Sequence, residues 1–163
     1  MPKLCLIAVS IDFAEGIRGL RLAIHKIREI ASVDQISSVY KHFRTSRKDD
    51  LNAEIWVAAK ITTHNEAEDL LVDLKKIEAD INQTRKRAEI FLAAYDDEII
   101  MQPSLTLPHP KLQAFALMTI CGAEIWGDFR HPILKESLSQ LAKTGLDNTT
   151  SEFLAQGKTL LDF

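Results

Sequence analysis

The stretch Leu51-Asn52-Ala53-Glu54-Ile55-Trp56-Val57-Ala58-Ala59-Lys60-Ile61 decides the fold. Apolar residues occupy every second position from Leu51 to Ile61, and mixed residues stand between them. Successive side chains of a β-strand point to opposite faces of its sheet, so this alternation predicts a strand. The mixed face leaves two interpretations open: Asn52 and Trp56 line a ligand cleft, or Trp56 packs beneath a loop.

The residues before this strand predict two more strands and a helix. The uninterrupted apolar run 4–9 is typical of a central strand that is buried on both faces. Apolar residues recur at spacings of three and four over 17–31, which predicts a helix with one face toward the core. Two β-branched pairs within 33–40 predict another strand, and the polar stretch 42–50, which has neither period, predicts a loop.

The residues after the strand complete the order of elements. Thr63-His64-Asn65-Glu66 has the form of a capping box, which marks a helix start. An apolar stripe predicts the helix over 67–81, 90–94 is the natural last core strand, and 98–101 is a short extended piece. Strand, helix, strand, strand, helix, strand is the order of a ferredoxin-like βαββαβ domain. We therefore expect an α+β sandwich whose helices pack on one face of an antiparallel sheet, with further helices toward the C-terminus.

The remaining residues supply those C-terminal helices. The mostly apolar segment 112–126 should close the core, and apolar residues over 133–141 suggest a short helix that Gly145 ends. We expect one main domain, 1–145, followed by a C-terminal helical extension, 146–163. The apolar side chains of this extension suit a helix that docks on the domain, binds a protein partner or mediates self-association.

Composition limits the classes of partner. The 163 residues are 46% hydrophobic, which is enough for one sizeable core. A formal net charge of −3 and a pI near 5.9 give no general attraction to nucleic acid or to anionic membranes. Cys5 and Cys121 lie far apart and require neither a disulfide nor a cysteine-rich metal site. No stretch approaches the ~18 apolar residues that span a bilayer, so we expect a cytoplasmic protein.

The stretch Leu105-Thr106-Leu107-Pro108-His109-Pro110 carries the most specific chemical signal. Each proline ring fixes its own backbone angle, and the second proline also restricts His109, so the imidazole is held in one direction. Imidazole acts as acid, base or ligand near neutral pH, and an aimed imidazole near acidic residues and arginines suggests phosphate chemistry. The alternative is that Pro-His-Pro is only a stiff loop after a strand.

A dense basic cluster, Gln83-Thr84-Arg85-Lys86-Arg87, precedes the last core strand. Guanidinium groups bind phosphate oxygens with two hydrogen bonds at once, so Arg85 and Arg87 are candidate phosphate ligands. The alternative is favourable charge near a helix C-terminus, worth a few tenths of a kcal/mol.

Several strings along roughly 4–144 occur in a characteristic order. They are Ile36-Ser37-Ser38-Val39-Tyr40, Leu51-Asn52-Ala53, Ile77-Glu78, Leu105 to Pro110, Ala114-Phe115-Ala116-Leu117 and His131-Pro132-Ile133-Leu134. This order resembles the pyrophosphokinase family of folate biosynthesis, which transfers pyrophosphate from ATP to 6-hydroxymethyl-7,8-dihydropterin. The resemblance implies a ferredoxin-like α+β fold, in agreement with the order of predicted elements, and an ATP-dependent diphosphokinase activity.

The resemblance also assigns roles to individual residues. It places Asn52 on the pterin, Glu78 and Thr106 beside the nucleotide, and Arg85 and His109 on the phosphates. Leu92 is a further candidate nucleotide contact, and Arg87 of the basic cluster is a further candidate phosphate ligand. It further implies two Mg²⁺ ions held by aspartates two residues apart on the last core strand. Counted back from Pro-His-Pro, those positions fall on Glu89 and Phe91. Glu89 is thus the candidate metal ligand, whereas a phenylalanine cannot bind Mg²⁺.

Three further departures lie where the family's catalytic residues are expected. The basic loop before the last core strand is several residues shorter, Val9-Ser10-Ile11 replaces a Gly-Ser-Asn turn, and an arginine before Ala114-Phe115 is absent. Two hypotheses follow. The chain is a working pterin pyrophosphokinase with a remodelled site, or it is an inactive family member that binds a pterin, a nucleotide or a protein partner.

Overall fold

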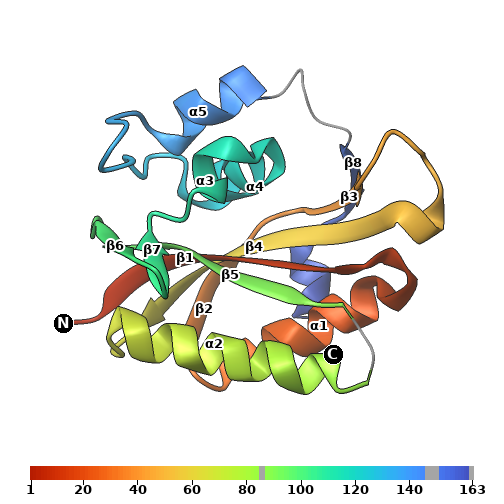
Figure 1. Cartoon of the computed structure of the whole chain (residues 1–163), viewed down its shortest axis with the longest axis horizontal. Coiled ribbons are helices and arrows are strands. Elements are labelled where there is room, and N and C mark those ends of the chain that lie inside the picture. The colour runs from red at the N-terminus through yellow and green to blue at the C-terminus, as the bar shows by residue number, and fades with distance from the viewer. Residues whose placement is uncertain (85–86, 146–150, 162–163) are drawn as a thin grey trace.

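A sheet of antiparallel strands forms the middle layer of the molecule (Figure 1). The computed structural model describes residues 1–84, 87–145 and 151–161. The strand order is β5-β1-β4-β3-β8, and β2 also pairs with β4. Strand β1 (Lys3–Asp12) lies between β4 (Ala53–Thr63) and β5 (Glu89–Tyr95). Residues 5–11 are buried on both faces of the sheet, which confirms the prediction of a central strand, whereas Leu4 at its start is exposed.

The strand that decides the fold begins two residues later than its alternation suggests. Leu51 lies in a short 3-10 helix, Asp50–Asn52, with 92% of its surface exposed. From Glu54 onward β4 pairs with β1, from Asp12↔Glu54 to Lys3↔Thr63. The ladder therefore runs along all of β4 after Ala53 and sets the face on which the side chains of both strands lie.

The predicted strand over 33–40 is two strands, β2 (Ser32–Ile36) and β3 (Val39–Phe43). Both pair with β4, one after the other along the same edge. Between them Ser37 remains tied to β4, because its N–H donates to the Ala58 carbonyl and its Oγ accepts from the Ala58 N–H, each at 2.9 Å. The side chain thus replaces a ladder hydrogen bond where the strand breaks.

Helices α1 (Gly16–Arg28) and α2 (Ala67–Asn82) cover one face of the sheet, as predicted (Figure 1). Their apolar stripes meet the odd-numbered side chains of β1 in the larger core. The predicted capping box is wrong: the Thr63 hydroxyl accepts from the N–H of Asn65 at 3.1 Å, and α2 begins without a side-chain cap.

The second face carries α3 (Lys111–Ala114), α4 (Ala116–Trp126) and α5 (Leu138–Gly145). These helices enclose a smaller core with the even-numbered side chains of β1 and with Trp56 of β4. The C-terminal helices therefore add a third layer to the predicted α+β sandwich. Residues 133 and 134 lie in a turn before α5. No helix in the described ranges is long and apolar enough to cross a membrane.

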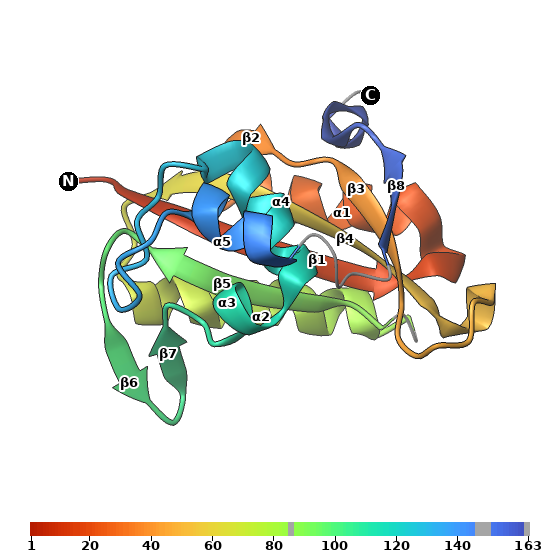
Figure 2. The same ribbon diagram turned by 90° about the horizontal axis from the view of Figure 1, so that it is seen from above.

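The last described segment is not the helical extension that the sequence predicts. Ser151–Ala155 forms strand β8, which pairs with β3, and Gly157–Leu160 forms one 3-10 turn beside α1 (Figure 2). The apolar run 153–155 is too short for periodicity to separate strand from helix, so pairing with the open edge of β3 decides the conformation. The turn is held by Arg21, whose guanidinium donates to the Thr159 carbonyl at 3.0 Å, and by the fully buried Leu160.

Replacing Gly157 by alanine should release this segment from the sheet. A Cβ at this position would lie 1.9 Å from the carbonyl oxygen of Ser37, so the two backbones must separate. We expect a loss of about 1–3 kcal/mol in the free energy of unfolding, measured by urea denaturation, and faster amide exchange in β3. Lys158→Ala, at an exposed neighbouring position, is the control. Unchanged exchange in β3 would contradict this packing.

Buried His131 should make the fold sensitive to acid. Its Nδ1 accepts the N–H groups of Ile133 and Leu134, each at 3.2 Å, and its Nε2 lies 3.3 Å from Oε1 of Gln113. A proton on Nδ1 would face two donors, and burial lowers the pKa of His131 below its usual 6.5. Since the unfolded chain then binds the proton more readily, His131 contributes its full stability above about pH 6.5. That contribution is lost as the pH falls through the lower pKa of the folded state.

Urea denaturation at about pH 7.5 and about pH 5 should show this loss, with a slope of up to about 1.4 kcal/mol per pH unit. His42 and His109 act in the same direction, because burial lowers the pKa of each. His131→Gln should be less stable than the parent but should depend less on pH. Lys158→Ala, at an exposed position that carries no histidine, should keep the parental slope. An equal slope in the parent and in His131→Gln would refute the assignment.

Candidate active site

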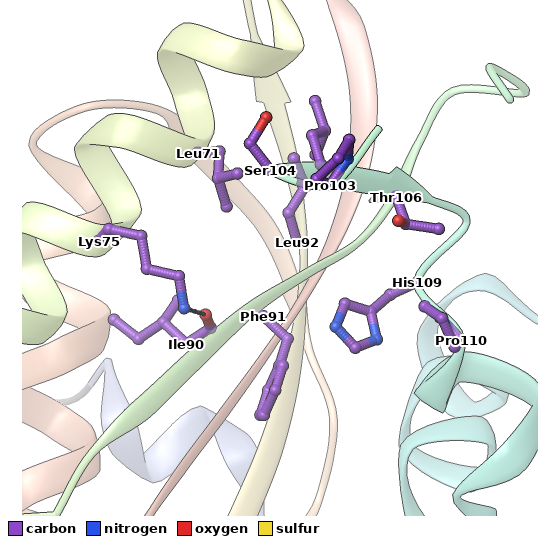
Figure 3. A pocket seen from close by; sticks show the side chains of 11 residues that line it. Leu71, Lys75, Ile90, Phe91, Leu92, Pro103, Ser104, Thr106, His109 and Pro110 are labelled. Atoms are coloured by element: carbon purple, nitrogen blue, oxygen red, sulfur yellow. Dashed lines mark hydrogen bonds between the residues drawn. The ribbon is translucent and has the colours of Figure 1, made fainter. Parts of the chain in front are cut away.

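A cavity of about 300 Å³ opens at the edge of strand β5 (Figure 3). It lies between α2 on one side and, on the other, the segment that contains β7 (Leu105–Leu107) and the Pro-His-Pro loop. Strand β6 (Ile100–Gln102) pairs with β7 and holds this segment as a hairpin. The lining residues are Leu71, Lys75, Ile90, Phe91, Leu92, Pro103, Ser104, Leu105, Thr106, His109 and Pro110.

The backbone of His109 is fixed to the edge strand. Its N–H donates to the Ala93 carbonyl of β5 at 2.9 Å. Its Nδ1 accepts the N–H of Lys111 at 3.1 Å, so the neutral ring carries its proton on Nε2. The imidazole points from the loop toward Phe91 and the cavity (Figure 3). The interpretation of an aimed histidine therefore agrees with this geometry.

The environment of His109 favours the neutral ring. Partial burial lowers its pKa, and the ammonium groups of Lys111 and Lys75 lower it further. A neutral imidazole with its proton on Nε2 is a hydrogen-bond donor toward the cavity. An anion bound there would reverse the balance, because it favours the protonated ring.

Thr106 and Leu92, the proposed nucleotide neighbours, both line this cavity. The Thr106 hydroxyl donates to the Gln102 carbonyl at 3.3 Å. Leu92 is almost fully buried and forms part of the wall. The structure thus brings together three of the residues expected from the sequence: His109, Thr106 and Leu92.

Glu78 lies behind the cavity wall. Its Oε2 accepts the Ile90 N–H at 2.7 Å and the Lys75 ammonium at 3.2 Å. Lys75 also donates to the Ile90 carbonyl at 3.3 Å. The outer edge of β5 has no neighbouring strand in the described sheet, so its Ile90 backbone groups are free to bind side chains of α2. Through these bonds Glu78 and Lys75 hold α2 at a fixed distance from β5, which sets the width of the cavity.

The remaining predicted residues lie elsewhere. Asn52 lines a separate cavity of about 360 Å³ beside residues 45–51, and its amide donates to the Thr45 hydroxyl at 2.6 Å and to the Arg47 carbonyl at 2.7 Å. Arg87 is exposed before β5, and Arg85 falls outside the described residues. Glu89 is exposed at the start of β5.

An aromatic cluster occupies the position next to Glu89. Phe91 stacks on Trp56 with ring centroids 5.6 Å apart and an angle of 11°, and Phe115 packs on Trp56 at 4.9 Å. His109 meets the Phe91 ring edge-on at 5.3 Å. Trp56 is therefore buried beneath the segment that leads into α4, which decides between the two interpretations of this residue. The Ser10 hydroxyl, on β1 between Trp56 and Glu89, is buried and has no hydrogen-bond partner in the described structure.

The donors at this end of the sheet do not fit a protein-held metal centre. Mg²⁺ needs close to six oxygen ligands, of which proteins supply one or two carboxylates at such sites. On this face of β5, the exposed carboxylate of Glu89 is followed by Phe91, whose ring is packed against Trp56. Across the described ranges, no three His, Cys, Asp or Glu side chains are grouped to hold a metal ion.

Sequence reasoning missed two lysines. Lys75 is three residues before Glu78, a spacing that places both on one helix face, and Lys111 directly follows Pro-His-Pro. The Lys111 ammonium lies 4.9 Å from the Phe91 ring centroid. Exposed lysines are common on helices and loops, so a lysine alone does not indicate a site. In the sequence, each of these two lysines could have been found only from its distance along the chain to Glu78 or to His109.

Comparison with known proteins identifies the family that has this architecture. The family model described as 7,8-dihydro-6-hydroxymethylpterin-pyrophosphokinase matches residues 7–126. The chain belongs to this pyrophosphokinase family. The match extends from β1 to the end of α4 and so contains the whole His109 cavity.

Related proteins agree with this assignment. A 2-amino-4-hydroxy-6-hydroxymethyldihydropteridine pyrophosphokinase of Aquifex aeolicus is 26% identical over 137 residues, which cover 80% of this chain and 83% of that protein. Two solved structures of wild-type Plasmodium falciparum HPPK-DHPS have TM-scores of 0.75, with pterin and p-hydroxybenzoate, and 0.74, with SDX-DHP, each at 10% identity. They cover 90% and 89% of this chain, which spans 44% of each, less than half their length. At this identity they show the shared fold.

The His109 ring should titrate below pH 6.5 in the free protein and at higher pH with a polyphosphate bound. Burial and two nearby ammonium groups lower its pKa, and a bound anion opposes them, so anion binding should strengthen as the pH falls. NMR titration of the histidine rings, in the absence and in the presence of tripolyphosphate, measures the pKa of His109 in the free and in the anion-bound protein. The signal that is missing in His109→Gln identifies the ring. A free-state pKa above 6.5 would contradict the geometry.

Proposed function

We propose that this protein transfers pyrophosphate from ATP to 6-hydroxymethyl-7,8-dihydropterin. The observation that carries the proposal is the family match over residues 7–126, which encloses the cavity with His109 aimed into it. The resemblance of the ordered sequence strings supports the same substrates. We further propose that the reaction takes place in the cytoplasm, which agrees with two buried cysteines in the reduced state.

The chemistry is an in-line displacement at the β-phosphorus of ATP. The hydroxymethyl oxygen of the pterin forms a bond to this phosphorus, the bond between the phosphorus and the α-phosphate oxygen breaks, AMP leaves, and the hydroxyl proton is released. Such transfer depends mainly on positioning and on charge stabilisation. His109 suits the second task, because its Nε2–H donates toward the cavity.

The other residues take supporting roles in this proposal. Thr106 and Leu92 contact the nucleotide, and Glu78 positions the cavity wall through Ile90. Arg85 and Arg87 approach the phosphates from the loop before β5. The Asn52 amide now donates to Thr45 and Arg47, and it contacts the pterin when it gives up these two hydrogen bonds and donates to the pterin instead. One exposed carboxylate does not hold Mg²⁺ alone, so Glu89 at most contacts an ion that ATP carries.

The decisive test is formation of AMP from ATP and the hydroxymethyl dihydropterin by the full chain. His109→Ala should lower kcat/KM by about 100-fold or more, because a charge-stabilising donor at the phosphates is lost. Lys76→Ala, on the same helix as Lys75 but outside the cavity lining, should keep the parental rate. Absence of AMP at high enzyme concentration, with the fold intact, would exclude the proposal.

One observation favours a second candidate function, a family member that binds a pterin or nucleotide without reacting it. Phe91 occupies a position where the resemblance implies a metal ligand, and its ring is stacked on Trp56. Calorimetric titration with an unreactive ATP analogue and with the pterin separates the two functions. Binding without AMP formation identifies the second candidate, and a lack of binding to either ligand excludes both.

A further inference from the structure

Basic side chains lie on both sides of the cavity. Lys75 lies on the α2 side, and His109 and Pro110 lie opposite, with Phe91 between them (Figure 3). None of the residues that line the cavity in the described structure is acidic. The nearest carboxylate engaged with a lining residue is Glu78, which binds the Ile90 N–H and Lys75 from behind the wall.

Lys111 is the cation that this arrangement leaves available. Its ammonium lies 4.9 Å from the centroid of the Phe91 ring and 6.0 Å from that of Phe115. Within the described ranges Lys111 forms no ion pair, whereas Lys75 is paired with Glu78. The Lys111 N–H to His109 Nδ1 bond fixes the start of the side chain beside the imidazole. A ring face attracts the ammonium only weakly compared with a phosphate oxygen.

The side chain at position 91 of β5 excludes a divalent ion held by the protein. Phe91 supplies no ligand oxygen, and its stack on Trp56 fills the space beside Glu89 with apolar surface. A triphosphate that enters this cavity therefore meets the Lys75 ammonium and the Nε2–H of His109, and no set of carboxylates. The Lys111 ammonium does not line the cavity but lies over the ring of Phe91, which does. The site has positive charge of its own and lacks a cage for Mg²⁺.

We propose that Lys111, together with His109 and Lys75, neutralises the phosphates of a nucleoside triphosphate in place of a protein-bound Mg²⁺, so that nucleotide binding does not require the metal. The inference rests on the proposed function only in taking ATP as the ligand. Lys111 is the principal residue, since it directly follows Pro-His-Pro and has no competing carboxylate in the described structure. Lys75 contributes from the other side, and Glu78 offsets part of its charge.

Calorimetric titration of the full chain with α,β-methylene-ATP, in EDTA and in excess MgCl₂, tests this directly. The Kd in EDTA should be within about threefold of that in Mg²⁺, because the protein supplies the positive charge. Lys111→Gln should weaken binding in EDTA by roughly tenfold or more, which is the effect of losing one charge-assisted phosphate contact. Binding in EDTA should also weaken with added KCl.

Two variants control for charge and for folding. Lys111→Arg keeps the charge and should retain most of the affinity, whereas Lys76→Gln removes one exposed ammonium of α2 outside the cavity lining and should leave the Kd unchanged. Lys111 is exposed, so its variants should fold, and their thermal midpoints should equal that of the parent. Equal weakening in Lys111→Gln and Lys76→Gln would show a general charge effect and overturn the assignment.

The outcomes separate this inference from the proposed function. AMP formation together with binding that requires Mg²⁺ would overturn the inference and leave the function standing. Binding in EDTA that depends on Lys111, without AMP formation, would support the inference and exclude the function. Absence of binding in both buffers would overturn the inference, and the AMP assay would then decide the function alone.

Discussion

The antiparallel ladder between β1 and β4 is the constraint on which the rest of the structure depends. Its register, from Asp12↔Glu54 to Lys3↔Thr63, assigns the odd-numbered side chains of β1 to the core under α1 and α2 and the even-numbered ones to the core under α4. A shift by one residue would exchange the two sets and bury the wrong side chains on both faces. Because β5 pairs with β1, the position of β1 also decides to which face the side chains of β5 point.

The candidate site is built on the open edge of that sheet. The backbone of β5 accepts the His109 N–H through Ala93 and meets the side chains of α2 through Ile90. A loop and a helix from different parts of the chain are thereby held at a fixed separation by hydrogen bonds to one strand. The cavity is the space that these two attachments leave beyond the strand. Its shape therefore depends on backbone groups that an edge strand leaves unpaired.

Sequence reasoning recovered the elements whose periods are long and the residues whose chemistry is unusual. The alternation from Ala53 to Ile61 and the apolar stripe of α2 specify their structures locally. The strand β8 was predicted as a helix because its conformation depends on pairing with β3, which no local pattern records. His109 was found because two prolines flank it, while Lys111 beside it carries no such mark. Asn52 was selected by resemblance, and its amide holds its own loop in this structure, so its contact with the pterin stays a prediction.

The Phe91 position shows how stability and chemistry compete for one place on a strand. An aromatic pair such as Phe91 and Trp56 contributes about 0.5–1.5 kcal/mol beyond the area it buries, whereas a carboxylate beside Glu89 would add like-charge repulsion in the absence of a metal. The ring therefore stabilises the site without an ion, and the ammonium of Lys111 can rest on its face. A cationic side chain attached to the loop is present whenever the protein is folded, while a divalent ion must be bound from solution. Positive charge at this cavity is thus a property of the folded chain and does not depend on the supply of metal.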